Sequence, residues 1–162
     1  MNQPDNQPYP NIVRKAQADA ATGKFSHPWN PRSEIHGTAL AKLAGLQRTG
    51  VTLARLAPGK ESFAYHSHQQ EEEWVYILSG RAVSRIDGRE YQLEAGDFVG
   101  FPTPSVAHIM ANPGPDDLIY LMGGENKACE IADFPELDKR MLKLNGQLVI
   151  YRLSDGQTID SK

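Results

Sequence analysis

The stretch His66–Gly80, HSHQQEEEWVYILSG, decides how this sequence folds. Residues two apart in an extended strand point to the same face, so His66 and His68 can present their imidazole rings side by side. The run WVYIL after Glu73 is β-branched and aromatic, which favours a second, antiparallel strand. If Glu73 faces the histidines, the three side chains form a His, His, carboxylate set suited to a divalent metal ion.

This stretch alone leaves an alternative open. Charge runs are usually solvated faces, so the same residues would also fit an acidic hairpin with two exposed histidines. A second segment, Gly96–Asn112 or GDFVGFPTPSVAHIMAN, favours the metal site. It predicts a turn, a strand, a proline-stiffened turn and a further strand that carries His108. His108 is a fourth candidate ligand.

The two segments resemble the paired motifs of the cupin family. Two glycines flank the candidate ligands of the first motif, and a glycine and a proline precede the candidate ligand of the second, at the family's spacing. The matching residues are Gly59, His66, His68, Glu73 and Gly80 in the first motif, and Gly96, Pro102, His108 and Asn112 in the second. The chain departs from the pattern at Pro104, where the family usually has glycine, and one extra residue precedes His108.

The resemblance implies a fold and a site. The fold is all-β, a single cupin jelly-roll barrel, or double-stranded β-helix, with an N-terminal extension and a short C-terminal appendage of helix and strand. The site is one divalent metal ion held by His66, His68, Glu73 and His108. Imidazole and carboxylate ligands suit iron, manganese, nickel, zinc or copper. Glu72 stays open as a substitute for Glu73, because only the spacing to Gly80 favours Glu73 over Glu72 as the ligand.

The predicted strands follow one another at short intervals, as in a β-sandwich or barrel. They are Val51–Leu56, Phe63–His68, Glu73–Ser79, Arg81–Ile86, Glu90–Leu93, Asp97–Phe101, Ala107–Asn112 and Leu118–Met122. Residues 1–36 are interpreted as an N-terminal arm and irregular segment, 37–125 as the barrel and 126–162 as the appendage.

Three segments outside the motifs receive separate predictions. Thr38–Leu46, TALAKLAGL, is expected to be extended, although its leucine spacing also fits a helix. Glu136–Gly146 is expected to form one or two helical turns before its glycine. Gln147–Leu153, QLVIYRL, predicts a last strand.

Composition excludes some classes of function. At 162 residues with 40% hydrophobic and 23% charged residues, the chain is expected to be one globular domain. A net charge of −3 gives no basic footprint for nucleic acid. No apolar run approaches the roughly 18 residues that span a membrane. The N-terminus lacks a secretory pattern, so a cytoplasmic location is expected. The single cysteine, Cys129, excludes an intrachain disulfide.

The resemblance supports several functions. A metal-dependent enzyme acting on a small oxygenated substrate comes first, because the chain is similar to small cupins described as sugar-phosphate isomerases. Sugar or sugar-phosphate isomerase or epimerase chemistry is therefore expected, with dioxygenase or decarboxylase chemistry as an alternative. A non-catalytic sugar- or metabolite-binding barrel is a further alternative. No catalytic acid or base can be assigned. A homodimer is expected, with Phe25 and Trp29 offered to the partner.

Overall fold

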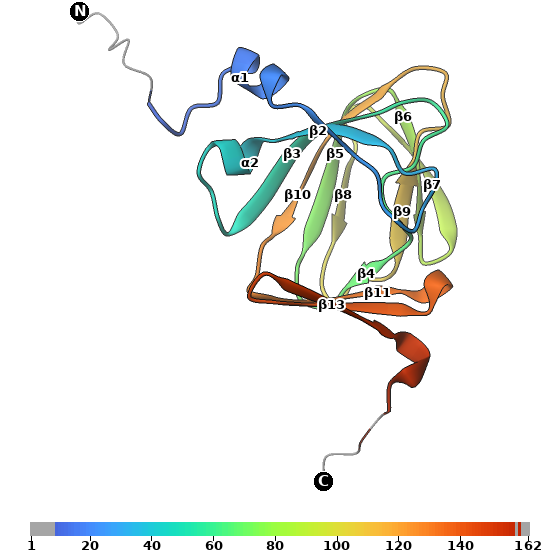
Figure 1. Ribbon diagram of the computed structural model, residues 1–162. Coiled ribbons are helices and arrows are strands. Elements are labelled where there is room, and N and C mark those ends of the chain that lie inside the picture. The colour runs from blue at the N-terminus through green and yellow to red at the C-terminus, as the bar shows by residue number, and fades with distance from the viewer. Residues whose placement is uncertain (1–8, 158, 160–162) are drawn as a thin grey trace, which may run out of the picture.

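The computed structural model describes residues 9–157 and residue 159, and about half of them lie in antiparallel β-strands (Figure 1). Short helices occur at α1 (Lys15–Ala20) and α2 (Leu40–Leu43). Turns of 3-10 helix occur at η1 (Pro135–Leu137) and η2 (Leu153–Asp155). The strands are β1 (Gly23–Phe25), β2 (Ile35–Ala39), β3 (Thr49–Leu56), β4 (Ser67–His68), β5 (Glu73–Ser79), β6 (Arg81–Ile86), β7 (Arg89–Glu94), β8 (Phe98–Phe101), β9 (His108–Ala111), β10 (Leu118–Glu125), β11 (Cys129–Phe134), β12 (Lys139–Leu144) and β13 (Gln147–Arg152).

The strands form three sheets, and the main core is built from the six-stranded and three-stranded sheets. A six-stranded sheet runs β1-β2-β3-β10-β5-β8, a three-stranded sheet runs β7-β6-β9, and a four-stranded sheet runs β13-β12-β11-β4. Strand alternation places Ile77 of β5 in the core and leaves its neighbours Tyr76 and Leu78 partly exposed. Leu56 and Leu118, from the neighbouring strands β3 and β10, are fully buried beside it. The predicted all-β jelly-roll class is confirmed.

Two of the separate segment predictions need correction. Thr38–Leu46 is extended only to Ala39 and then forms α2, so the leucine spacing correctly indicated a helix there. Glu136–Gly146 is not helical beyond η1. Its residues Lys139–Leu144 form β12, because pairing with β11 on one side and β13 on the other satisfies their backbone groups.

The strand predicted at Phe63–His68 is also shorter than expected. Regular pairing is limited to β4, and His66 joins His108 through an isolated bridge. The strand predicted at Gln147–Leu153 is present as β13.

The C-terminal strands lie against the barrel rather than apart from it. β11 pairs with β4, with Ala132 opposite His68 and Asp133 opposite Ser67. Figure 1 shows β11 and β13 crossing one end of the barrel beside β4. The stretch after residue 125 therefore contributes directly to the surroundings of the two histidines. The proposed domain division at residues 36 and 125 stays a prediction, and residues 1–8 of the arm lie outside the described residues.

The irregular N-terminal segment packs its aromatic residues on its own chain. The Trp29 ring lies edge-on to Phe134 with ring centroids 5.0 Å apart, and Phe25 packs against Phe63 at 5.5 Å. Phe25 remains about half exposed. The predicted homodimer stays a prediction. Within the described residues, no helix has the length and apolar character needed to cross a membrane.

Candidate metal centre

Three elements bring the predicted ligands together. His68 lies on β4, Glu73 begins β5 and His108 begins β9. The backbones of His66 and His108 exchange two hydrogen bonds, at 3.1 and 2.7 Å, so these two residues are held directly opposite each other. Ser105, in the proline-stiffened turn before β9, accepts a 2.7 Å hydrogen bond from the backbone N–H of His68. The turn that departs from the family pattern thus still supports a ligand.

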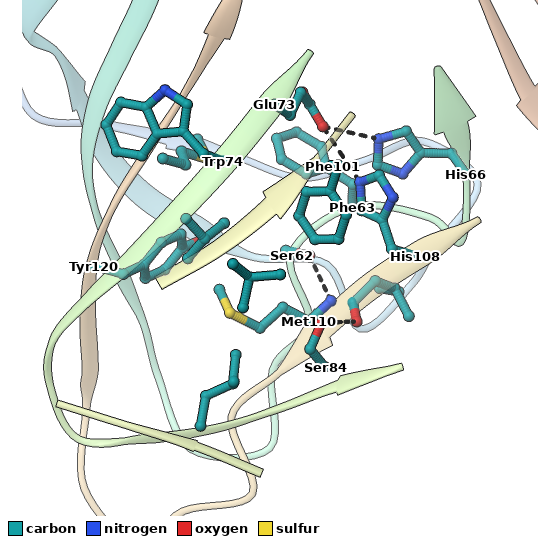
Figure 2. A pocket seen from close by; sticks show the side chains of 15 residues that line it. Ser62, Phe63, His66, Glu73, Trp74, Ser84, Phe101, His108, Met110 and Tyr120 are labelled. Atoms are coloured by element: carbon teal, nitrogen blue, oxygen red, sulfur yellow. Dashed lines mark hydrogen bonds and ion pairs between the residues drawn. The ribbon is translucent and has the colours of Figure 1, made fainter. Parts of the chain in front are cut away.

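The four side chains converge on one point. The Nε2 atoms of His66, His68 and His108 lie 3.9, 3.2 and 3.3 Å from Oε2 of Glu73. One ligand atom from each residue lies within 4.8 Å of the others. All three histidines are buried. Figure 2 shows Glu73 reaching towards His66 and His108, which face it from the opposite side. Glu72 is exposed and lies outside this cluster.

The outer ring nitrogens are held by different partners. Nδ1 of His66 lies 2.8 Å from the carbonyl oxygen of Ala64, and Nδ1 of His108 lies 3.0 Å from that of Val106. A carbonyl oxygen only accepts hydrogen bonds, so both Nδ1 atoms must carry the proton. In the neutral rings, each Nε2 then presents a lone pair to the centre.

This arrangement fits a bound cation. With their Nδ1 protons directed outward, neutral rings of His66 and His108 would direct their Nε2 lone pairs, and Glu73 its carboxylate, towards one space. Nε2 of His68 is buried and makes no regular hydrogen bond. Converging acceptors are favourable only when a positive charge lies between them, either a proton or a metal ion. Three imidazoles and one carboxylate match the donor preferences of borderline divalent metals.

The electrostatics of the metal-free cluster favour the ligating forms of His66 and Glu73 and the protonated form of His68. Burial, aided by neighbouring His108, lowers the pKa of His66 to about 3, so its ring stays neutral. Burial tends to raise the pKa of Glu73, but interactions with His108 and His68 outweigh it and hold that pKa well below its usual range. For His68, burial tends to lower the pKa, but the carboxylates of Glu73 and Glu130 outweigh it and raise the pKa.

Two phenylalanine rings stack on two of the candidate ligands and restrict their ring planes. Phe101 stacks on His108 at a centroid distance of 3.7 Å and an angle of 11°. Phe134 stacks on His66 at 5.8 Å and 20°. Phe101 is the last residue of β8, and Phe134 is the last residue of β11. No sequence pattern connected Phe134 with the site.

A second group of potential ligands is already satisfied by the protein. His68, Glu71 and Glu130 also lie within metal-binding distance of one another. The carboxylate of Glu71, however, accepts hydrogen bonds from Lys143 Nζ at 2.5 Å and from the backbone N–H of Lys127 at 2.6 Å. The carboxylate of Glu130 accepts hydrogen bonds from backbone N–H groups of the turn after β4. No cation is needed to account for either carboxylate.

A small, largely apolar cavity adjoins the cluster. The space open to the centre of a water-sized sphere is about 50 Å³, enough for a few waters or a small ligand, since one water needs about 10–15 Å³ by this measure. Figure 2 shows Tyr120 at the end of the cavity away from His66 and His108. Phe101, Met110, Tyr120 and Met122 line this cavity, whereas Tyr65 and Tyr76 lie outside it.

Comparisons with known proteins agree with the fold and the motifs. A family model described as the cupin domain matches residues 52–123. A solved structure from Acidithiobacillus ferrooxidans, provisionally named a sugar phosphate isomerase, is 30% identical, with a TM-score of 0.89, and the match covers 94% of this chain and 98% of that one.

Two further relatives are more distant or only partly covered. A structure from Silicibacter pomeroyi, described as a sugar phosphate isomerase from a cupin superfamily, is 23% identical with a TM-score of 0.74, over 88% of this chain and 94% of that one, and shows the fold alone. A curated oxalate-binding protein from Thermotoga maritima is 37% identical over 67 residues, which are 41% of this chain and about half, 54%, of that protein. From its paired motifs, its fold and these relatives, the chain belongs to the cupin superfamily.

Proposed function

We propose that this protein is a metal-dependent enzyme that binds one divalent metal ion through His66, His68, Glu73 and His108. The observation that carries the proposal is the convergence of the three Nε2 atoms on Oε2 of Glu73, within 3.2 to 3.9 Å. Such a set leaves positions open on a metal that prefers six ligands, and open positions distinguish a reactive centre from a structural one.

Some residues of the chain would hold the metal and its ligands, and others would enclose the cavity beside them. The outward hydrogen bonds of His66 and His108 select the tautomer that ligates, and the stacked rings of Phe134 and Phe101 hold the imidazole planes. A bound divalent metal would supply a Lewis acid that polarises a carbonyl or hydroxyl oxygen. The apolar walls limit water in the cavity, which strengthens electrostatic interactions there.

Isomerisation of a sugar or sugar phosphate is the first candidate reaction. It is supported by the relative from Acidithiobacillus ferrooxidans, of which this chain matches 98%. Lys and Arg are missing from the fifteen residues that line the cavity. The phosphate of such a substrate would therefore lie outside the enclosed space, with only the sugar end entering it.

Binding or decarboxylation of a small carboxylate is a second candidate. The cavity of about 50 Å³ favours it, because a two-carbon dicarboxylate needs far less room than a sugar phosphate. The oxalate-binding relative supports the same class of ligand. The metal would offset the negative charge of the carboxylate ligand, which no cationic side chain of the cavity lining neutralises.

Metal binding is the first test. Metal-free protein is titrated calorimetrically with iron(II), manganese(II), nickel(II) or zinc(II), and one equivalent of at least one metal should bind. His68→Ala should lose this binding. His36→Ala should keep it, because His36 lies outside the cluster and contacts Glu34. Absence of stoichiometric binding in the unsubstituted protein would overturn the proposal.

The loaded protein then separates the two reactions. Aldose and ketose phosphates are followed by NMR for interconversion, and oxalate is followed for binding and for release of carbon dioxide. Turnover of the phosphates that is lost in His68→Ala supports isomerisation. Oxalate binding without any effect on the phosphates supports the second candidate.

A further inference from the structure

Glu130 is a buried carboxylate on β11, seven residues beyond the end of the family match at residue 123. It is 1% exposed. Its oxygens accept hydrogen bonds from three successive backbone N–H groups, those of Gln69 at 3.0 Å, Gln70 at 3.0 Å and Glu71 at 2.7 Å. These three residues form the turn that joins His68 on β4 to Glu73 on β5.

The same carboxylate faces one of the proposed ligands. Oε1 of Glu130 lies 3.3 Å from Nδ1 of His68. The contact is close for an ion pair but falls short of a regular hydrogen bond, and Nδ1 has no other polar partner among the residues that the structure describes. His66 and His108 instead direct Nδ1 to the backbone carbonyls of Ala64 and Val106. Among the three histidines, His68 alone is backed by a carboxylate.

We propose that Glu130 is a positioning residue for the metal centre, which orients His68 and fixes its tautomer from outside the matched cupin segment. The part of this proposal that concerns metal binding rests on the proposed function. The effect of Glu130 on the His68 ring does not. A carboxylate behind Nδ1 favours the tautomer in which Nδ1 carries the proton. The Nε2 lone pair is then free to ligate, and the nearby negative charge makes that nitrogen a stronger ligand.

The geometry explains why the carboxylate comes from β11. β4 has only two residues and pairs with β11, where Ala132 lies opposite His68. Strand alternation turns Glu130, Ala132 and Phe134 to the same, buried face of β11. Phe134 stacks on His66 and Glu130 reaches His68, so one face of this strand contacts both histidines of the first motif.

The first test uses metal-free protein and requires no substitution. Long-range ¹H–¹⁵N NMR spectra of the imidazole rings report which nitrogen of each histidine carries the proton. We expect a protonated Nδ1 on His68 whose proton exchanges slowly with water, as a buried proton facing a carboxylate should. A His68 ring that carries its proton only on Nε2 would overturn the proposal, whatever the protein does with metals.

The second test compares two carboxylate-to-amide changes. Glu130→Gln presents either an amide N–H₂ or a weaker carbonyl acceptor to the turn and to His68. Glu125→Gln is the matched control, because Glu125 accepts a 3.2 Å hydrogen bond from the backbone N–H of Glu72 in the same connection but contacts no histidine. Both variants are first checked for folding by circular dichroism.

Metal affinity then distinguishes positioning from simple support of the turn. Calorimetric titration with nickel(II) should show a 10- to 100-fold loss of affinity in Glu130→Gln, the range typical of lost partners behind a metal ligand. Glu125→Gln should bind as the unsubstituted protein does. Equal affinities in all three proteins, or equal losses in both variants, would contradict a specific role for Glu130. If Glu130→Gln does not fold, the NMR result on the unsubstituted protein decides.

Discussion

Gly124 of β10 provides a sharp test of how the barrel positions Glu73. It lies opposite Glu73 in the pairing of β10 with β5. A Cβ at this position would lie 2.8 Å from the carbonyl oxygen of Glu72 and 3.1 Å from Cγ of Glu73. Relief to an ordinary contact near 3.4 Å needs a shift of about 0.6 Å away from the backbone carbonyl of Glu72, which joins Glu73, and of about 0.3 Å away from Cγ of Glu73 itself. Functional sites must be held within about 0.5 Å, so Gly124→Ala should move Glu73 out of position.

The expected cost of Gly124→Ala is about 1–3 kcal/mol of unfolding free energy, as for other overpacked sites, and at least a roughly tenfold loss of metal affinity. Urea unfolding of the metal-free protein and calorimetric titration with nickel(II) measure the two effects. Gly50→Ala is the matched control. Gly50 lies on β3 and pairs with Gly124 of β10, and a Cβ on Gly50 would meet only the carbonyl oxygen of Gly124, at 3.8 Å. Unchanged metal affinity in Gly124→Ala would refute the reasoning.

Three other outcomes are expected. Tyr120→Phe removes a buried hydroxyl that has no hydrogen-bond partner within the described part of the chain, so urea unfolding should show stability that is unchanged or raised by about 1 kcal/mol; a clear loss would mean that the hydroxyl is bonded in solution. Leu118→Ala empties a fully buried core position and should cost about 2–5 kcal/mol in the same assay. Chelation of the metal-loaded protein should lower its unfolding free energy by about 2.7 kcal/mol if the metal was present at 100 times Kd, measured by thermal denaturation; no change would argue against a metal bound to the folded state.

The candidate ligands could be predicted because the information is local. His66 and His68 share a face through the two-residue period of a strand, and the following apolar run indicated where Glu73 begins the next one. Their convergence with His108, 35 residues from Glu73 in sequence, was anticipated only through the resemblance of the paired motifs.

Other features depend on how distant strands pair. The β-structure of Lys139–Leu144 is decided by its two neighbours, β11 and β13, and its local sequence was wrongly interpreted as helical. Glu130 meets the turn after His68 only because β11 docks in one register on the two-residue strand β4. A slip of one residue would turn its carboxylate to the opposite face.

The sequence by itself thus determined the all-β class and the chemical character of the centre, because strand periodicity and ligand spacing are properties of short segments. The tertiary structure alone decided which side chains support those ligands. Phe134, which stacks on His66, and Glu130, which faces His68, come from a strand more than 60 residues further along the sequence. Gln69 and Glu130, for example, are 61 residues apart. Contacts at that separation follow from the register of the folded sheet, which no local pattern encodes.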